Sequence, residues 1–107
     1  MAALALSSRQ VRRLRALAHH LKPLVQLGQD GLSPGIVQAV ERALLDHELI
    51  KVQMRQPQDK EAVGRAVADA TGAALCGLVG HTVILYRPHP DKPRIELDPS
   101  KATKVPS

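Results

Sequence analysis

The residues of this chain that could do chemistry on a ligand include a short turn with a glycine at each end, Gly28-Gln29-Asp30-Gly31. An apolar run typical of a strand precedes the turn, and Ser33 begins a predicted helix just after it. Glycines at both ends let backbone N–H groups face outward without side chains in the way. The helix start adds partial positive charge. The pattern favours a surface that accepts a phosphate backbone, and a plain strand-to-helix turn is the alternative.

Positive charge is concentrated just before this turn, because residues 1–22 hold five Lys and Arg and no acid. Apolar residues recur there at helical spacing and predict one buried face, namely Val11, Leu14, Leu17, Ala18 and Leu21. The opposite, basic face is predicted to hold Arg9, Arg12, Arg13 and His20. Lys22 precedes Pro23, which is expected to end the helix.

His19 and His20 could suggest a metal site, but neighbouring helical residues point about 100° apart and cannot easily share one ion. Neither a Cys nor a third His stands at ligand spacing. Cys76 lies inside an apolar run, which is typical of a buried, inert thiol. We therefore expect no metal, no cofactor and no enzymatic activity.

Three carboxylates near the end of the second predicted helix, Glu41, Asp46 and Glu48, are interpreted as a solvated face. Tyr86 is the only aromatic residue and is expected to pack in the core. Because Phe and Trp are absent, an aromatic platform for stacking bases is absent too.

The charge balance favours a polyanionic partner, with nucleic acid ahead of a membrane surface. Fifteen Lys and Arg face ten Asp and Glu in 107 residues, which gives a net charge of +5. One cysteine allows no internal disulfide and points to a reducing compartment. The sequence shows neither a signal peptide nor an apolar run of about 20 residues. We expect a soluble, cytoplasmic monomer.

The order of predicted elements is helix, strand, helix, strand, helix, strand, strand, which indicates a single α/β domain with a four-stranded mixed sheet and three helices. The expected elements are a helix from Ser7 or Ser8 to Pro23, a strand at residues 24–27, a helix from Ser33 to near His47, a strand at residues 49–55, a helix from Asp59 to Gly72, and a hairpin of residues 74–79 and 83–87. Residues 1–88 are assigned to the domain, and residues 89–107 to a proline-rich, mostly irregular tail whose Ile95 and Leu97 could dock on it.

The stretch from Leu17 to Leu32, LAHHLKPLVQLGQDGL, resembles the signature of the CRM-domain (YhbY-like) RNA-binding family. Further motifs match in the same order, namely HELIKV at residues 47–52, TGA at residues 71–73 and GHTVILYRP at residues 80–88. The resemblance extends from about Ser7 to Pro88. It implies a fold related to the C-terminal domain of translation initiation factor three, and a single-domain protein that binds ribosomal RNA of the large-subunit precursor during ribosome assembly.

Carried onto this chain, the resemblance implies RNA contacts from the Gly28–Gly31 loop, including Gln29 and Asp30, and from the basic positions of the first helix. Lys51 and Arg55, on the wet face of an alternating strand, are weaker candidates, and His81 follows the hairpin glycine. Asp30 and His81 stand where family members often carry a basic residue, which predicts weaker or more pH-sensitive binding. The alternative is a protein-interaction module whose basic helix docks on an acidic partner.

Overall fold

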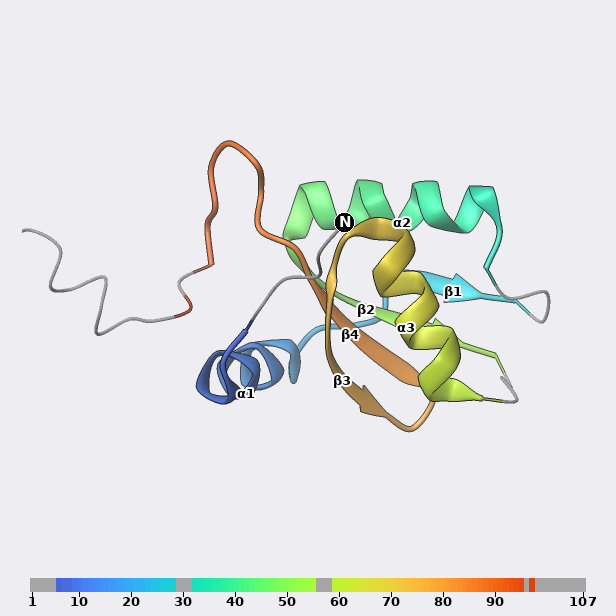
Figure 1. Ribbon diagram of the computed structural model, residues 1–107, viewed down its shortest axis with the longest axis horizontal. Coiled ribbons are helices and arrows are strands. Elements are labelled where there is room, and N and C mark those ends of the chain that lie inside the picture. Colours follow the sequence, from blue (N-terminus) through green and yellow to red (C-terminus); the bar gives the residue numbers. More distant parts are fainter. Residues whose placement is uncertain (1–5, 29–31, 56–58, 96, 98–107) are drawn as a thin grey trace, which may run out of the picture.

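The computed structural model describes residues 6–28, 32–55, 59–95 and 97 (Figure 1). Its element order is the predicted one. The elements are α1 (Ser8–Ala18), β1 (Val25–Leu27), α2 (Pro34–His47), β2 (Leu49–Met54), α3 (Lys60–Thr71), β3 (Ala74–Val79) and β4 (Thr82–Tyr86).

The four strands form one mixed sheet in the order β1-β2-β4-β3, which confirms the predicted sheet. β1 pairs parallel to β2, with α2 as the connection between them. β4 lies antiparallel to both β2 and β3, and the β3–β4 pair is the predicted hairpin. The register places Lys51 opposite Ile84 and Gln53 opposite Thr82.

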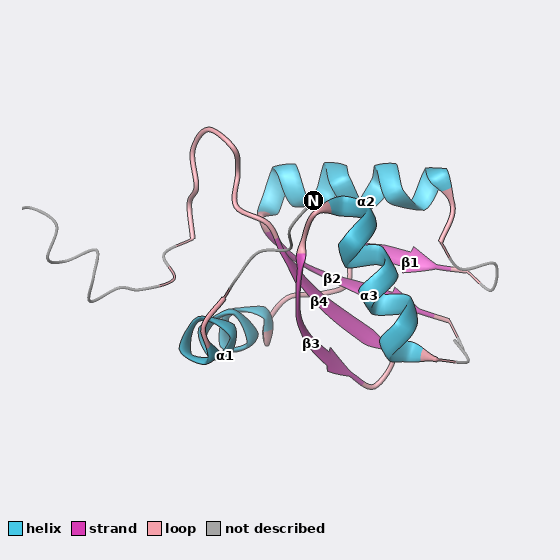
Figure 2. Ribbon diagram, in the orientation of Figure 1, coloured by secondary structure: helices cyan, strands magenta, loops and turns pink. Residues whose placement is uncertain are grey.

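The helices cover the two faces of the sheet unequally (Figure 2). On one face, α2 and α3 enclose the main core, which contains Val40 and Leu44 of α2 and Val67 of α3. On the other face, α1 is the described helix that packs, through the fully buried Leu14 and Ala18. Beside α1 part of this face remains exposed, including Gln26 and Gln53, and we call this exposed part the open sheet face.

α1 begins where the sequence indicates and ends earlier. Ser7 is its N-cap, and Ser7 and Gln10 form a reciprocal capping box. The last helical residue is Ala18, so the prediction that the helix continues to Pro23 is wrong. Beyond it, the N–H of Leu21 donates to the carbonyl of Ala18 at 2.9 Å in a tight turn. His20 and Lys22 therefore lie after the helix.

The buried face of α1 is narrower than predicted. Leu14 and Ala18 are buried and Val11 is half-buried, whereas Leu17 and Leu21 are each 38% exposed. Early termination of the helix explains this difference for Leu21, because the helical periodicity no longer sets its direction.

The boundaries of α2 and α3 follow their capping signals. The hydroxyl of Ser33 accepts from the N–H of Ile36, and Pro34 follows as the first helical residue of α2. Asp59 caps α3 by accepting from the N–H of Ala62 at 3.0 Å. Gly72 ends α3 with a φ of +68°, a left-handed conformation that favours glycine.

Glu48 corrects the interpretation of a solvated carboxylate face. Its side chain is fully buried, and its backbone has a φ of +67° at the C-cap of α2. The carboxylate accepts from the N–H of His89 at 2.7 Å, of Arg94 at 2.9 Å and of Ile95 at 3.0 Å. Glu48 thereby fixes the segment after β4, which we call the strap (residues 88–95). Glu41 and Asp46 remain partly exposed.

The strap packs against the α1 side of the sheet. Ile95 and, just beyond the strap, Leu97 contact the cluster that contains Leu14, Ala18 and Tyr86. This packing confirms the predicted docking of Ile95 and Leu97. It also means that α1 is held by the sheet and by the strap together.

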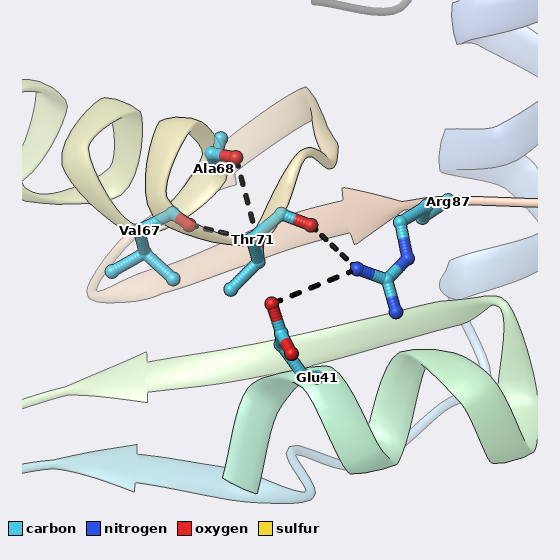
Figure 3. A network of polar contacts seen from close by, with 5 residues as sticks. All are labelled: Glu41, Val67, Ala68, Thr71 and Arg87. Atoms are coloured by element: carbon cyan, nitrogen blue, oxygen red, sulfur yellow. Dashed lines mark hydrogen bonds and ion pairs between the residues drawn. The ribbon is translucent and has the colours of Figure 1, made fainter. Parts of the chain in front are cut away.

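A second polar network joins α2, α3 and the end of β4 (Figure 3). Arg87 donates to the carbonyl of Thr71 at 2.6 Å and lies 4.0 Å from the carboxylate of Glu41. The hydroxyl of Thr71 donates to the carbonyls of Val67 and Ala68. The network joins the C-terminal end of α3 to the residue that follows β4.

Candidate nucleic-acid interface

A groove of about 650 Å³ runs between α1 and the open sheet face; we call it the helix groove. Its cations come from two elements, Arg12 and Arg15 from α1 and Lys51 from β2. Its floor is formed by the sheet and its side by the exposed flank of α1. The other lining residues that bear on binding are His19, His20, Val79, Thr82 and Ile84.

Two local contacts position the cations of the helix groove. The ammonium of Lys51 donates to the carbonyl of Leu21 at 3.0 Å, which fixes it beside the segment that follows α1. Arg15 lies over Gly77 of β3, where an added Cβ would stand 3.3 Å from the Arg15 Nε. A residue without a side chain at position 77 therefore leaves room for this guanidinium.

A second hollow, of about 480 Å³, lies where β1 and β2 end; we call it the strand-end hollow. Gly28, Arg55 and His81 come together there from three separate segments. Backbone bonds hold them, because Arg55 N–H donates to the carbonyl of Leu27 and Met54 N–H donates to the carbonyl of His81. A Cβ at Gly28 would meet no atom within 4 Å, so the backbone here is open to approach.

The two hollows lie along the same strand of the open sheet face. Lys51 lines the first and Gln53 the second, and residues two apart on a strand point to the same side. Gln53 is paired with Thr82, which lines the helix groove. Among the described residues that line either hollow, none is Asp or Glu. The surface is therefore positive along its length.

The structure brings together some of the predicted site residues and separates others. Arg12, His20 and Lys51 share the helix groove, and Gly28 and His81 share the strand-end hollow. Gln29, Asp30 and Gly31 lie outside the described residues.

Three predicted contacts lie elsewhere. Arg9 and Arg13 belong to α1, but neither is among the described residues that line the two hollows. Lys22 lines a third, mainly apolar hollow together with Leu17, Leu21 and Leu24.

Arg15 is the groove residue that sequence reasoning missed. The signal was present, because Arg12, Arg15 and His19 are spaced three and four apart, which places them on one side of a helix. The predicted basic face of Arg9, Arg12, Arg13 and His20 leaves Arg15 out, because the sequence does not show from which direction the sheet meets the helix.

The side chains of Cys76 and Tyr86 are buried and contribute to packing. Cys76 is buried, and burial raises the pKa of its thiol to about 11, so the thiolate is scarce near neutral pH. Burial, followed by the nearby Glu48 carboxylate, raises the pKa of Tyr86, which packs in the core as predicted.

Within the described part of the chain, no group of three or more His, Cys, Asp or Glu could hold a metal ion. No described helix is long and apolar enough to cross a membrane.

Comparison with known proteins gives one consistent result. The family model of the CRS1 / YhbY (CRM) domain matches residues 6–87. A Haemophilus influenzae protein named RNA-binding protein is 42% identical over 85 residues, which are 78% of this chain and 86% of that protein. The Bacillus subtilis protein named Probable RNA-binding protein YqeI is 35% identical over 94 residues, which are 86% of this chain and 98% of that protein. The solution structure of a Staphylococcus aureus protein, described as a candidate RNA-binding protein, matches with a TM-score of 0.77 at 30% identity, over 88% of this chain and 100% of that one.

Proposed function

Because the chain belongs to the CRS1/YhbY (CRM) domain family, we propose that it binds RNA and that the helix groove and the strand-end hollow form the binding surface. The observation that carries this proposal is the convergence of Arg12, Arg15 and Lys51 on one groove whose described lining contains no acid. Such a surface attracts a polyanion, and its described lining contains no negative charge that would repel it.

The chemistry favours contacts to phosphates. Arg12 and Arg15 offer guanidinium groups that can each donate two parallel hydrogen bonds to a phosphate. Lys51 offers a point charge already held by the Leu21 carbonyl. At the other end, Gly28 leaves the backbone accessible, and Arg55 adds a further cation.

We further propose that the RNA is ribosomal RNA of the large-subunit precursor, that the protein acts during ribosome assembly in the cytoplasm, and that it does so as a monomer. The family resemblance supports this assignment. A site that holds RNA mainly through phosphates suits a structured, highly charged particle.

Sedimentation of a lysate on sucrose gradients, at two salt concentrations and with or without RNase, tests the ribosomal assignment. Co-migration with large-subunit precursors that is lost at high salt and after RNase supports it, because phosphate contacts release counterions. Co-migration that survives RNase contradicts it in favour of a protein partner. Migration at the top of every gradient would contradict the association with ribosomal particles.

Matched charge reversals test the surface itself. Lys51→Glu should lower affinity for RNA about tenfold or more and reduce the slope of log affinity against log salt by about one. Arg65→Glu is the control, because Arg65 is an exposed residue of α3 on the opposite side of the sheet. Equal losses for both variants would show that net charge, and not this groove, governs binding.

A further inference from the structure

We infer that the open sheet face binds an unpaired, single-stranded segment of RNA, whose bases contact the amides of Gln26 and Gln53 while its phosphates contact the surrounding cations. This inference rests on the proposed function, because it assigns the form of RNA that the same surface takes. It is carried by the uncharged polar groups where the two hollows adjoin and by the shape that α1 gives to this face.

The first observation is a pair of side-chain amides with hydrogen-bonding capacity to spare. Gln26 Nε2 donates to Gln53 Oε1 at 3.0 Å, between neighbouring strands and at an exposed position. Each amide has a carbonyl oxygen and an NH2 group, so the pair keeps one oxygen and one NH2 group available. Adjacent donors and acceptors of this kind match the edge of a base, and they match a phosphate poorly because a phosphate only accepts.

The second observation is the division of charge across the surface. Where the hollows adjoin, the sheet carries Gln53 and Thr82, which are polar and uncharged, with Val79 beside them. The guanidinium groups of Arg12 and Arg15 stand at the α1 side, and that of Arg55 at the strand ends. The ammonium of Lys51 comes from the sheet but is held at the Leu21 carbonyl, beside the segment that follows α1. Phosphates are therefore expected along the edges, with bases turned toward the sheet.

The third observation is the concave shape. α1 stands beside the open sheet face, so the floor lies at the bottom of a groove and not on a flat surface. Paired bases of an A-form helix present their edges in a shallow minor groove and a narrow major groove, and cannot reach such a floor. Unpaired bases can be turned out of the strand and into it.

The length of the surface fits a short segment. The five residues of β2 and its extension from Lys51 to Arg55 span about 13 Å, as four steps of 3.3 Å. A stacked strand of this length has about four nucleotides at roughly 3.4 Å each, and a strand whose bases are turned toward the sheet has fewer. Selectivity among bases should then come from the amides, because the described part of this face carries no Phe, Tyr or Trp. Stacking on the rings of His19, His20 or His81 would be tolerant of base identity.

Fluorescence anisotropy with the full-length protein tests the inference. The probes are labelled oligo(A), oligo(C) and oligo(U) of about 12 nucleotides and a blunt duplex of the same length. We expect the duplex to bind at least tenfold more weakly than the preferred single strand. The double variant Gln26→Ala/Gln53→Ala should reduce the preference among the three strands by roughly fivefold or more. The control is Gln38→Ala, an exposed glutamine of α2 on the other side of the sheet.

The outcomes separate the inference from the proposal on which it rests. Equal affinity for duplex and single strands, or a base preference unchanged in Gln26→Ala/Gln53→Ala, would overturn the inference while RNA binding itself stands. Absence of binding to every probe, and to total ribosomal RNA in the same assay, would overturn both. Circular dichroism of the double variant distinguishes loss of selectivity from loss of fold.

Discussion

Replacement of the buried Glu48 by glutamine should destabilise the protein by about 2 kcal/mol. The carboxylate accepts from three backbone N–H groups of the strap, those of His89, Arg94 and Ile95. An amide in its place keeps one acceptor oxygen and turns an NH2 group toward a donor. The change loses one charge-assisted hydrogen bond, worth about 1.5–3 kcal/mol, and strands one N–H at a cost of about 1–3 kcal/mol. Removal of a buried charge offsets part of this loss.

The destabilisation should depend on pH. Burial raises the pKa of Glu48, but the N–H groups of His89, Arg94 and Ile95 and the charge of Arg94 lower it more, so the pKa lies below the ordinary value of about 4.3. A carboxyl whose pKa is lowered by folding contributes stability above its unfolded pKa, and this stability is lost as the pH falls through the folded pKa. The difference between the wild type and Glu48→Gln should therefore be full at pH 7 and shrink below about pH 4.

Urea denaturation followed by far-ultraviolet circular dichroism measures this difference, since the chain has no Trp to serve as a fluorescent probe. A loss of about 2 kcal/mol corresponds to a decrease in Tm of roughly 10 °C for a domain of this size. Asp46→Asn is the matched control, because Asp46 has an exposed carboxylate in the same region, which lies 3.5 Å from the Arg42 guanidinium. It should change stability by less than about 0.5 kcal/mol. An equal, pH-independent effect of both variants would refute the role given to the Glu48 carboxylate.

Three other predictions concern the groove, a helix end and the thiol. Gly77→Val should displace Arg15, lower affinity for RNA several-fold and cost about 1–3 kcal/mol of stability, since an added Cβ would stand 3.2 Å from Ile84 Cδ1 and 3.3 Å from Arg15 Nε. Arg15→Ala should lower affinity alone, and anisotropy together with urea titration compares the two variants. Gly72→Ala should lower the Tm by a few degrees in calorimetry, because the φ of +68° costs a residue with a Cβ about 1 kcal/mol; an unchanged Tm would contradict this. Cys76 should resist alkylation by iodoacetamide at pH 7.5 in the native protein and react with it in urea, because the thiol is buried. Mass spectrometry measures the alkylated fraction, and rapid alkylation of the native protein would contradict this prediction.

Local signals in the sequence predict much of the fold. Capping residues identify the ends of both helices of the main core, because capping depends on residues only a few positions apart. Ser33 and Pro34 mark the start of α2, and Asp59 and Gly72 mark the start and the end of α3. The alternation of apolar and polar residues from Leu49 onward identifies β2 and its solvent-exposed face, because this pattern also depends on residues close together in the sequence.

Contacts between distant segments could not be predicted in this way. The role of Glu48 depends on N–H groups 41 to 47 positions further along the chain, so its position beside Glu41 and Asp46 suggested a solvated residue. On the interface, Gly28 and His81 line one hollow although they are distant in the sequence, and Arg15 joins the helix groove because α1 packs on the sheet from one particular side.

The strap also shows how unevenly tolerance to substitution is distributed. Every hydrogen bond that Glu48 forms with it comes from a backbone N–H, so these bonds themselves place no demand on the identity of the side chains at positions 89, 94 and 95. Proline is the exception at each of the three, because it has no N–H to donate. Side-chain identity in this segment is therefore constrained by other contacts, such as the packing of Ile95, while a single position some forty residues earlier holds its backbone.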